Sequence, residues 1–159
     1  YLRSWQNKIA YVPQNIFLGD SSIEQNIAFG VPSHQIDMER VAMAANKAQI
    51  SSLLEKSESS YDSCVGENGI RLSGGQKQRI GIARALYKDA NILVFDEATS
   101  ALDVKTELSV MESIGNLSRD LTIIMISHKL NILQDFDRIV CLEQGQIIAD
   151  APPNTGIKN

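Results

Sequence analysis

Two short segments of the sequence combine residue types that could carry out chemistry. In the first, residues 73–76, a serine precedes two glycines and a glutamine, and a segment with helical periodicity follows. In the second, residues 92–97, an unbroken apolar run ends in two adjacent carboxylates, Asp96 and Glu97. Backbone amides at the start of a helix can receive a phosphate, and carboxylates can hold a metal ion and orient a water molecule. Together the two segments indicate a site that hydrolyses a nucleotide.

Three apolar runs must position these residues, and each is predicted to be a β-strand that leads to polar side chains. Residues 8–12 lead to Gln14, residues 91–95 lead to Asp96 and Glu97, and residues 121–126 lead to Ser127 and His128. Ligands of an open parallel sheet bind beyond the carboxyl ends of its strands. We therefore expect these polar side chains to converge on one site.

The chemistry of these side chains suggests a role for each of them. Asp96 suits a Mg²⁺ ion, because Mg²⁺ prefers hard oxygen ligands and keeps several waters. Glu97 could polarise an attacking water molecule. Gln14 could bridge the metal and that water, and His128 could donate a hydrogen bond to a terminal phosphate.

Each of these features also has a purely structural interpretation. Adjacent carboxylates after a strand often mark the start of a helix, where they interact with the helix dipole. A single histidine such as His128 is usually a structural residue. Ser73 and Gln76 match a capping box, which would account for both side chains but not for the two consecutive glycines between them.

The apolar periodicity predicts helices, a hairpin and a parallel sheet. Helices are predicted at residues 21–29, 37–54, 76–86 and 104–117, and the hairpin joins residues 138–142 to residues 146–149. In the last helix the apolar stripe consists of Val104, Leu108, Met111 and Ile114. The strands at residues 91–95 and 121–126 are continuously apolar, which is typical of strands buried on both faces.

This order of elements predicts an α/β fold within one partial domain. A strand, a helix and a second strand in the later part of the chain imply parallel pairing through a right-handed crossover. The segment between Gln14 and Asn91 is nearly all helical. We therefore expect a helical subdomain at residues 20–90, inserted into a sheet core that continues over residues 91–150 with the C-terminal hairpin.

Composition excludes several classes of function. The 159 residues suffice for one domain, and 43% hydrophobic and 21% charged residues are ordinary for a globular protein. The net charge of −4 gives no basic footprint for nucleic acid. The longest apolar stretches are far shorter than the ~20 residues that span a bilayer. Cys64 and Cys141 lack the spacing of a metal site, so we expect reduced thiols.

The order and spacing of the motifs closely resemble those of the ATP-binding cassette (ABC) ATPases, from about Tyr1 to Ala149. Residues 11–14 resemble the Q-loop, and residues 72–76 resemble the signature motif. Asp96 and Glu97 resemble the Walker B motif with its catalytic glutamate; residues 100–103 resemble the D-loop, and His128 resembles the switch histidine. The resemblance implies a P-loop NTPase-like sheet core and binding of ATP with Mg²⁺.

The same resemblance implies a role for each matching residue. The expected catalytic residues are Glu97, His128 and Gln14, and the expected metal ligands are Asp96 and Gln14. The residues expected to bind nucleotide are Ser73, Gly74, Gly75, Gln76 and Asp103. Two such domains would dimerise head to tail, so that the signature motif of one domain binds the ATP held by the phosphate loop of the other.

The phosphate loop itself is not found in the sequence. In these ATPases it reads G-x-x-x-x-G-K-[ST], and none of the ten glycines of this chain precedes a lysine. We therefore expect the chain to be the later part of a truncated nucleotide-binding domain, inactive by itself, whose phosphate loop lies upstream of Tyr1. Residues 151–159 also differ from the sequence that usually follows the hairpin.

Three features resemble the exporter-type transporters, which include flippases. Ala98 follows the catalytic glutamate, where many importers and soluble relatives have proline. Residues 22–30 resemble the stretch after the exporter Q-loop, and residues 64–69 resemble the exporter X-loop. The resemblance implies that Glu67 and the loop at Gln14 meet membrane domains earlier in the same polypeptide, at the cytoplasmic face of a membrane.

Two alternatives remain open at this point. The first is a soluble ABC ATPase that acts as a mechanical switch, for example on ribosomes or in DNA maintenance; Ala98 and the absence of basic character argue against it. The second is a degenerate regulatory module, against which the intact Gln14, Glu97 and His128 argue. The sequence does not select a transported substrate among lipids, lipid-linked sugars, peptides and drugs.

Overall fold

The computed structural model describes residues 2–51, 60–116 and 121–153, and the chain divides into two compact units, Tyr1–Ile126 and Ser127–Asn159. The predicted division between a helical subdomain at residues 20–90 and a sheet core at residues 91–150 stays a prediction.

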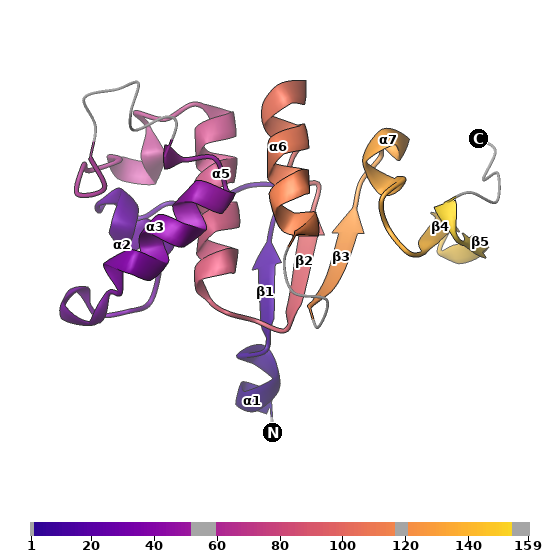
Figure 1. Cartoon of the computed structure of the whole chain (residues 1–159), viewed down its shortest axis with the longest axis horizontal. Helices are drawn as coiled ribbons and strands as arrows, with labels where there is room; N and C mark the ends of the chain where they lie inside the picture. The colour runs from indigo at the N-terminus through magenta and orange to yellow at the C-terminus, as the bar shows by residue number, and fades with distance from the viewer. Residues whose placement is uncertain (1, 52–59, 117–120, 154–159) are drawn as a thin grey trace. The chain divides into compact units, whose positions relative to one another are not determined.

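The first unit contains three parallel strands in the order β1-β2-β3 (Figure 1). The strands are β1 (Ile9–Val12), β2 (Ile92–Asp96) and β3 (Thr122–Ile126). Their register pairs Val12 with Phe95 and Asp96 with Ile126. The predicted α/β fold with parallel pairing is therefore confirmed, and the carboxyl ends of the strands lie at one edge of the sheet.

Helices occupy the chain between β1 and β2, as the predicted helical insertion requires. They are α2 (Ile23–Ile27), η1 (a 3₁₀ helix, Ser33–Gln35), α3 (Met38–Lys47), η2 (a 3₁₀ helix, Glu67–Gly69) and α5 (Gly74–Tyr87). Helix α1 (Leu2–Gln6) precedes β1, and α6 (Val104–Gly115) joins β2 to β3. Figure 1 shows α2, α3 and α5 grouped to the left of the three strands.

Polar side chains fix the starts of these helices. Ser22 caps α2 and Ser73 caps α5, each in a capping box with the glutamine three residues later. Asp37 caps α3 and Asp103 caps α6 in the same way, by accepting a backbone amide of the first turn. These caps satisfy amides that have no partner inside the helix, so local sequence determines where the helices begin.

The helix predicted at residues 37–54 ends earlier than expected. It stops at Lys47, and Gln49 adopts a φ of 60°, in the left-handed region that an α-helix cannot continue through. Residues 52–54 of the predicted helix lie outside the described residues.

The two faces of the sheet differ in burial. Leu93 and Phe95 of β2 are buried with Val12 in one core cluster that also holds Val110 of α6. On the opposite face Ile92 and Val94 are only half-buried, and Tyr11, Ile124 and Ile126 are 56%, 48% and 49% exposed. The prediction that β2 and β3 are buried on both faces is therefore wrong for the described residues, because their helices cover one face and successive strand residues alternate between faces.

Helix α6 buries only part of the predicted stripe: Ile114 is buried and Met111 packs half-buried against the core. Its buried residues are Glu107, Val110 and Ile114, whereas Val104 and Leu108 are 69% and 60% exposed. Both stripes have helical spacing, so periodicity alone did not distinguish them. The buried stripe is the one that joins the core cluster through Val110 and Ile114.

The second unit contains α7 (Leu130–Leu133) and an antiparallel hairpin of β4 (Ile139–Glu143) and β5 (Gln146–Ala151). The turn residues Gln144 and Gly145 have φ values of 45° and 78°, as a two-residue hairpin turn with two positive φ angles requires. The predicted hairpin is thus confirmed. In the part of the chain that the structure describes, no helix has the length and apolar character needed to cross a membrane.

Candidate functional site

Two adjacent carboxylates stand at the carboxyl end of the central strand. Asp96 is the last residue of β2, and Glu97 follows it with a φ of 49°. The Glu97 backbone amide donates to the carbonyl oxygen of Ile126 at 3.0 Å, which ties the turn to the end of β3. A non-glycine residue in this conformation is uncommon and costs free energy, so the fold imposes a defined direction on the chain at Glu97.

Both carboxylates accept hydrogen bonds from the segment that ends β1. The Tyr11 hydroxyl donates to Asp96 Oδ2 at 2.8 Å, and Gln14 Nε2 donates to Glu97 Oε2 at 2.8 Å. The predicted residues Gln14, Asp96 and Glu97 are thus brought together. Sequence reasoning missed Tyr11, although the parallel strand order and the alternation of side chains place it on the same face as Asp96.

The Tyr11–Asp96 hydrogen bond also changes the acidity of the phenol. It raises the pKa of Tyr11 above its ordinary value, because deprotonation would lose a bond to a carboxylate and place two negative charges side by side. The hydroxyl therefore remains a donor that holds the Asp96 carboxylate at physiological pH.

The donor set at this edge fits Mg²⁺. Within the described residues no group of three or more His, Cys, Asp or Glu side chains lies close enough to form a cage of protein ligands. Mg²⁺ is ordinarily bound by one or two carboxylates together with waters and substrate phosphates. The carboxylate of Asp96 supplies hard oxygen donors of that kind. The side-chain amide of Gln14, which is bonded to the adjacent residue Glu97, carries a further oxygen.

The signature segment lies at the N-terminus of α5. Ser73 Oγ accepts from the Gln76 amide at 3.3 Å, and the Gln76 side chain accepts from the Ser73 amide at 2.7 Å. The capping-box interpretation of Ser73 and Gln76 is therefore confirmed. Ser73 and Gly74 remain exposed, so this helix end is accessible to an anion.

The second of the two glycines, Gly75, is explained by a close backbone approach. A Cβ at Gly75 would lie 3.0 Å from the carbonyl oxygen of Ala101, and one at Gly74 would lie 3.6 Å from the Ala101 Cβ. Glycine at position 75 therefore lets α5 rest against the turn that follows Glu97. Capping alone left Gly75 unexplained.

The turn after Glu97 leads directly into α6. Backbone bonds join Ser100 N to Glu97 O at 3.1 Å and Leu102 N to Thr99 O at 3.0 Å. The buried Gln78 of α5 binds the middle of this turn, because its Nε2 donates to Ser100 Oγ at 3.2 Å and its Oε1 accepts from Ala101 N at 2.9 Å.

Asp103, predicted to bind nucleotide, acts in the structure as the N-cap of α6. Its carboxylate accepts from Thr106 N at 3.1 Å and from Thr106 Oγ1 at 2.6 Å. These hydrogen bonds lower the pKa of Asp103 below its ordinary value. The carboxylate of Asp103 is consequently held in a fixed orientation next to the turn.

The loop after Gln14 lies against the segment that resembles the X-loop. Ser22 pairs with Cys64 in an isolated β-bridge, and the Val65 amide donates to Ser21 O at 3.1 Å. The Cys64 thiol donates to Asp20 Oδ1 at 3.2 Å. The two segments that the sequence associated separately with membrane domains are therefore neighbours in the fold.

His128 belongs to the second unit, Ser127–Asn159. It stays a predicted site residue on the evidence of the sequence.

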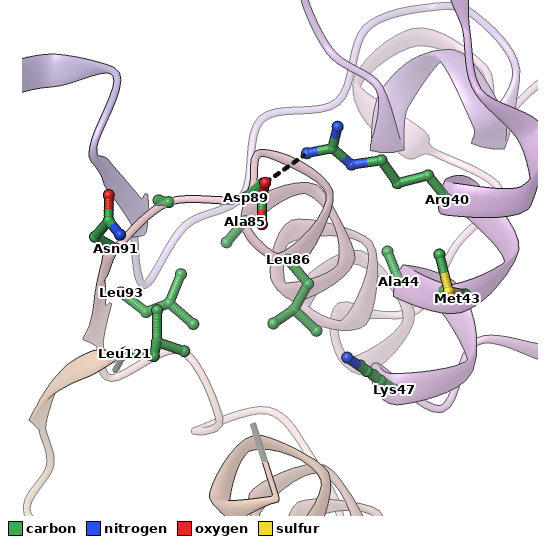
Figure 2. Close-up of a pocket in the computed structure, with 11 residues that line it drawn as sticks. Arg40, Met43, Ala44, Lys47, Ala85, Leu86, Asp89, Asn91, Leu93 and Leu121 are labelled. Atoms are coloured by element: carbon green, nitrogen blue, oxygen red, sulfur yellow. Dashed lines mark ion pairs between the residues drawn. The ribbon is translucent and has the colours of Figure 1, made fainter. Parts of the chain in front are cut away.

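A hollow of about 540 Å³ lies at the other end of the sheet (Figure 2). It is lined by α3, by the end of α5 and by Asn91, Leu93 and Leu121, near the amino ends of β2 and β3. At its rim Arg40 and Asp89 form an ion pair at 3.9 Å. None of the predicted site residues lines it, so this hollow is separate from the carboxylates at the carboxyl end of β2.

Comparisons with known proteins agree on one family. The sequence model of the family described as "ABC transporter" matches residues 1–100. The chain is 42% identical over 148 residues to an ATP-dependent lipid A-core flippase of Ralstonia nicotianae, covering 92% of the chain and 25% of that protein. It is 43% identical over 143 residues to an ATP-dependent lipid A-core flippase of Chromohalobacter salexigens, covering 90% of the chain and 24% of that protein.

A solved structure shows the same likeness in three dimensions. The fold matches a bacterial Atm1-family ABC exporter with ATP bound at a TM-score of 0.87 and 37% sequence identity, covering 93% of the chain and 26% of that exporter. The chain thus spans about a quarter of the length of the curated relatives it matches.

Proposed function

Because the chain belongs to the ABC transporter family, we propose that it is the ATP-binding and ATP-hydrolysing domain of an exporter-type transporter. The observation that carries the proposal is the pairing of Gln14 with Glu97, 2.8 Å apart, beyond the carboxyl end of β2. The relatives named as flippases and the solved exporter support the exporter class. They do not favour a soluble ABC ATPase that acts as a mechanical switch.

Glu97 is the proposed general base of hydrolysis. Its carboxylate accepts a proton from the water that attacks the terminal phosphate of ATP. Gln14 donates to one oxygen of this carboxylate and so fixes its orientation toward the water. The backbone tie from the Glu97 amide to Ile126 keeps the residue at the edge of the sheet during turnover.

Asp96 and Gln14 are the proposed residues for Mg²⁺. When bound, Mg²⁺ neutralises negative charge on the β- and γ-phosphates. The part played by this chain is to hold a carboxylate in place, and the Tyr11 hydroxyl does so for Asp96 through its hydrogen bond.

The signature residues Ser73, Gly74 and Gly75 are proposed to bind the terminal phosphate of ATP held by a second domain of the same kind. Ser73 and Gly74 are exposed at this helix start, and the positive end of the helix dipole favours an anion there. Gln76 fixes Ser73 through the capping box, and Asp103 lines the adjacent turn. His128 is proposed to donate a hydrogen bond to a terminal phosphate of ATP.

The proposed partners are membrane domains on the same polypeptide, at the cytoplasmic face of a membrane where ATP is available. Their contact would be the paired surface formed by the loop after Gln14 and the segment at Glu67. The β-bridge between Ser22 and Cys64 supports this contact, because a membrane domain that docks on one of the two segments would also act on the other. The names of the two relatives favour a lipid as the transported molecule.

The experiment compares Glu97→Gln with Glu143→Gln in the full-length protein in lipid vesicles. Glutamine keeps the shape of Glu97 but cannot take the proton, so ATP turnover should fall by about 10²–10⁴ while ATP binding persists. Glu143 is exposed on the hairpin, and its variant should turn over like the unmodified protein. Unchanged turnover in Glu97→Gln would remove Glu97 from the chemistry.

A further inference from the structure

One buried polar side chain joins the two functional segments of the first unit. Gln78 lies one turn into α5, is 4% exposed, and contacts no carboxylate of the site in any bond described above. Its amide uses both of its ends: the nitrogen donates to Ser100 Oγ at 3.2 Å and the oxygen accepts from the Ala101 amide at 2.9 Å. Because a buried amide is costly unless both ends are bonded, this arrangement ties Gln78 to one geometry.

The same residue, Ala101, is held from a second direction. The carbonyl oxygen of Ala101 lies 3.0 Å from the position a Cβ would take on Gly75. The turn around it is anchored in the core, since Ala98 and Leu102 are 2% and 8% exposed. The start of α5 and the turn that follows Glu97 are therefore joined by a polar clamp and by a close backbone contact.

We propose that Gln78 is a positioning residue that holds the turn at residues 97–103 against the signature end of α5, so that the two move as one body. The inference rests on the proposed function, in which Ser73–Gly75 engage one nucleotide and Glu97 acts on another. Gln78 touches neither nucleotide in that arrangement. Its effect is to transmit a shift at the start of α5 to the turn that carries Glu97.

The chemistry of the clamp predicts an order among substitutions. Burial favours the neutral form of a glutamate at this position, and a neutral carboxyl can accept from the Ala101 amide and donate to the Ser100 hydroxyl. Leucine has a similar size but can do neither. We therefore expect ATP turnover to be highest in the unmodified protein, lower in Gln78→Glu and lowest in Gln78→Leu. If position 78 only made an ordinary buried apolar contact, the variants would not follow this order.

The first measurement is hydrogen exchange of the peptide covering residues 97–103 in the full-length protein. Gln78→Leu should speed exchange in this peptide by about fivefold, the change that the loss of one net hydrogen bond supports. Ser100→Ala removes one of the two bonds and keeps Gln78, so it should speed exchange of this peptide less than Gln78→Leu does. Combined with Gln78→Leu, it should cause no further increase in the exchange rate. Unchanged exchange in Gln78→Leu would overturn the clamp.

The second measurement is ATP turnover of the same proteins. Gln78→Leu should lower kcat about tenfold or more and leave the affinity for ATP within about twofold, with partial rescue in Gln78→Glu. The exposed Gln35→Leu serves as the matched control and should leave both values unchanged. Faster exchange with normal kcat would show a structural role alone and overturn the proposal. A full-length protein that hydrolyses no ATP would contradict the proposed function, and the exchange data would still decide whether Gln78 holds the turn.

Discussion

Replacement of Asn26 by leucine should destabilise the first unit through one fully buried amide. Asn26 is 0% exposed in α2, the helix that follows the loop after Gln14. Its nitrogen donates to Gly19 O at 3.0 Å, to Ser21 Oγ at 3.1 Å and to Ser22 O at 3.0 Å, and its oxygen accepts from Gly19 N at 2.9 Å. One side chain thus supplies the hydrogen bonds that close the loop at residues 19–22.

The expected loss follows from these bonds. Each net hydrogen bond contributes about 1 kcal/mol, and a buried backbone group left without a partner costs about 1–3 kcal/mol. Leucine has the same side-chain branching and recovers part of the loss by burying apolar surface. Arg84 Nη2 also donates to the Asn26 oxygen at 3.4 Å, and five bonds lost against that gain give a decrease of about 3 kcal/mol in the free energy of unfolding.

The assay is urea unfolding of the purified chain, followed by circular dichroism, for Asn26→Leu and the control Asn46→Ala. Asn46 is exposed on α3, so its variant should change stability by less than about 0.5 kcal/mol. The loop should also loosen, because Ser21 accepts the amide of Val65 from the neighbouring segment. A loss below about 1 kcal/mol in Asn26→Leu would refute the accounting of these bonds.

Two further predictions concern the start of α5 and the cap of α6. Gly75→Asp should block ATP-driven dimerisation in the full-length protein while nucleotide binding to the same protomer persists, because the new side chain meets Ala101 O at 3.0 Å and its charge repels a phosphate. A mixed dimer would pair a Gly75→Asp protomer with a protomer that lacks the phosphate-loop lysine. Nucleotide trapped at one remaining site would support action of the signature motif across the dimer. Complete loss of nucleotide trapping would count against it. Bonds from Thr106 lower the pKa of Asp103, so its cap should stabilise the fold above pH about 4 and lose this contribution as the pH falls through the lower folded value. Asp103→Asn, which can cap without titrating, should show a flatter decline in unfolding midpoint with acid, and coincident profiles for the two proteins would contradict this.

Several parts of the fold could be read directly from the sequence because they depend on near neighbours. Ser22, Ser73 and Asp37 cap helices through bonds that span three residues. The hairpin turn at Gln144 and Gly145 needs only two residues with positive φ. The candidate site could also be predicted from the sequence, because parallel strands bring their carboxyl ends to one edge of the sheet and thereby bring Gln14 to Glu97.

Other features depended on contacts between segments far apart in the chain. The spacing of α6 allowed burial of Leu108 or of Val110, and the packing of Val110 into the core decided between them. The exposure of Ile124 followed from which face of the sheet the helices cover. A one-dimensional pattern fixes the period of apolar residues but not the surface they meet.

The polar contacts around the site show the same division. The sequence identified Asp96 and Glu97 as chemically capable residues, whereas the register of β1 against β2 placed Tyr11 beside Asp96. Gln78 looks like an ordinary helix residue until α5 packs on the turn before Asp103, where its amide binds Ser100 and Ala101. Hydrogen bonds between distant segments require a particular distance and direction, and only the assembled tertiary structure supplies both.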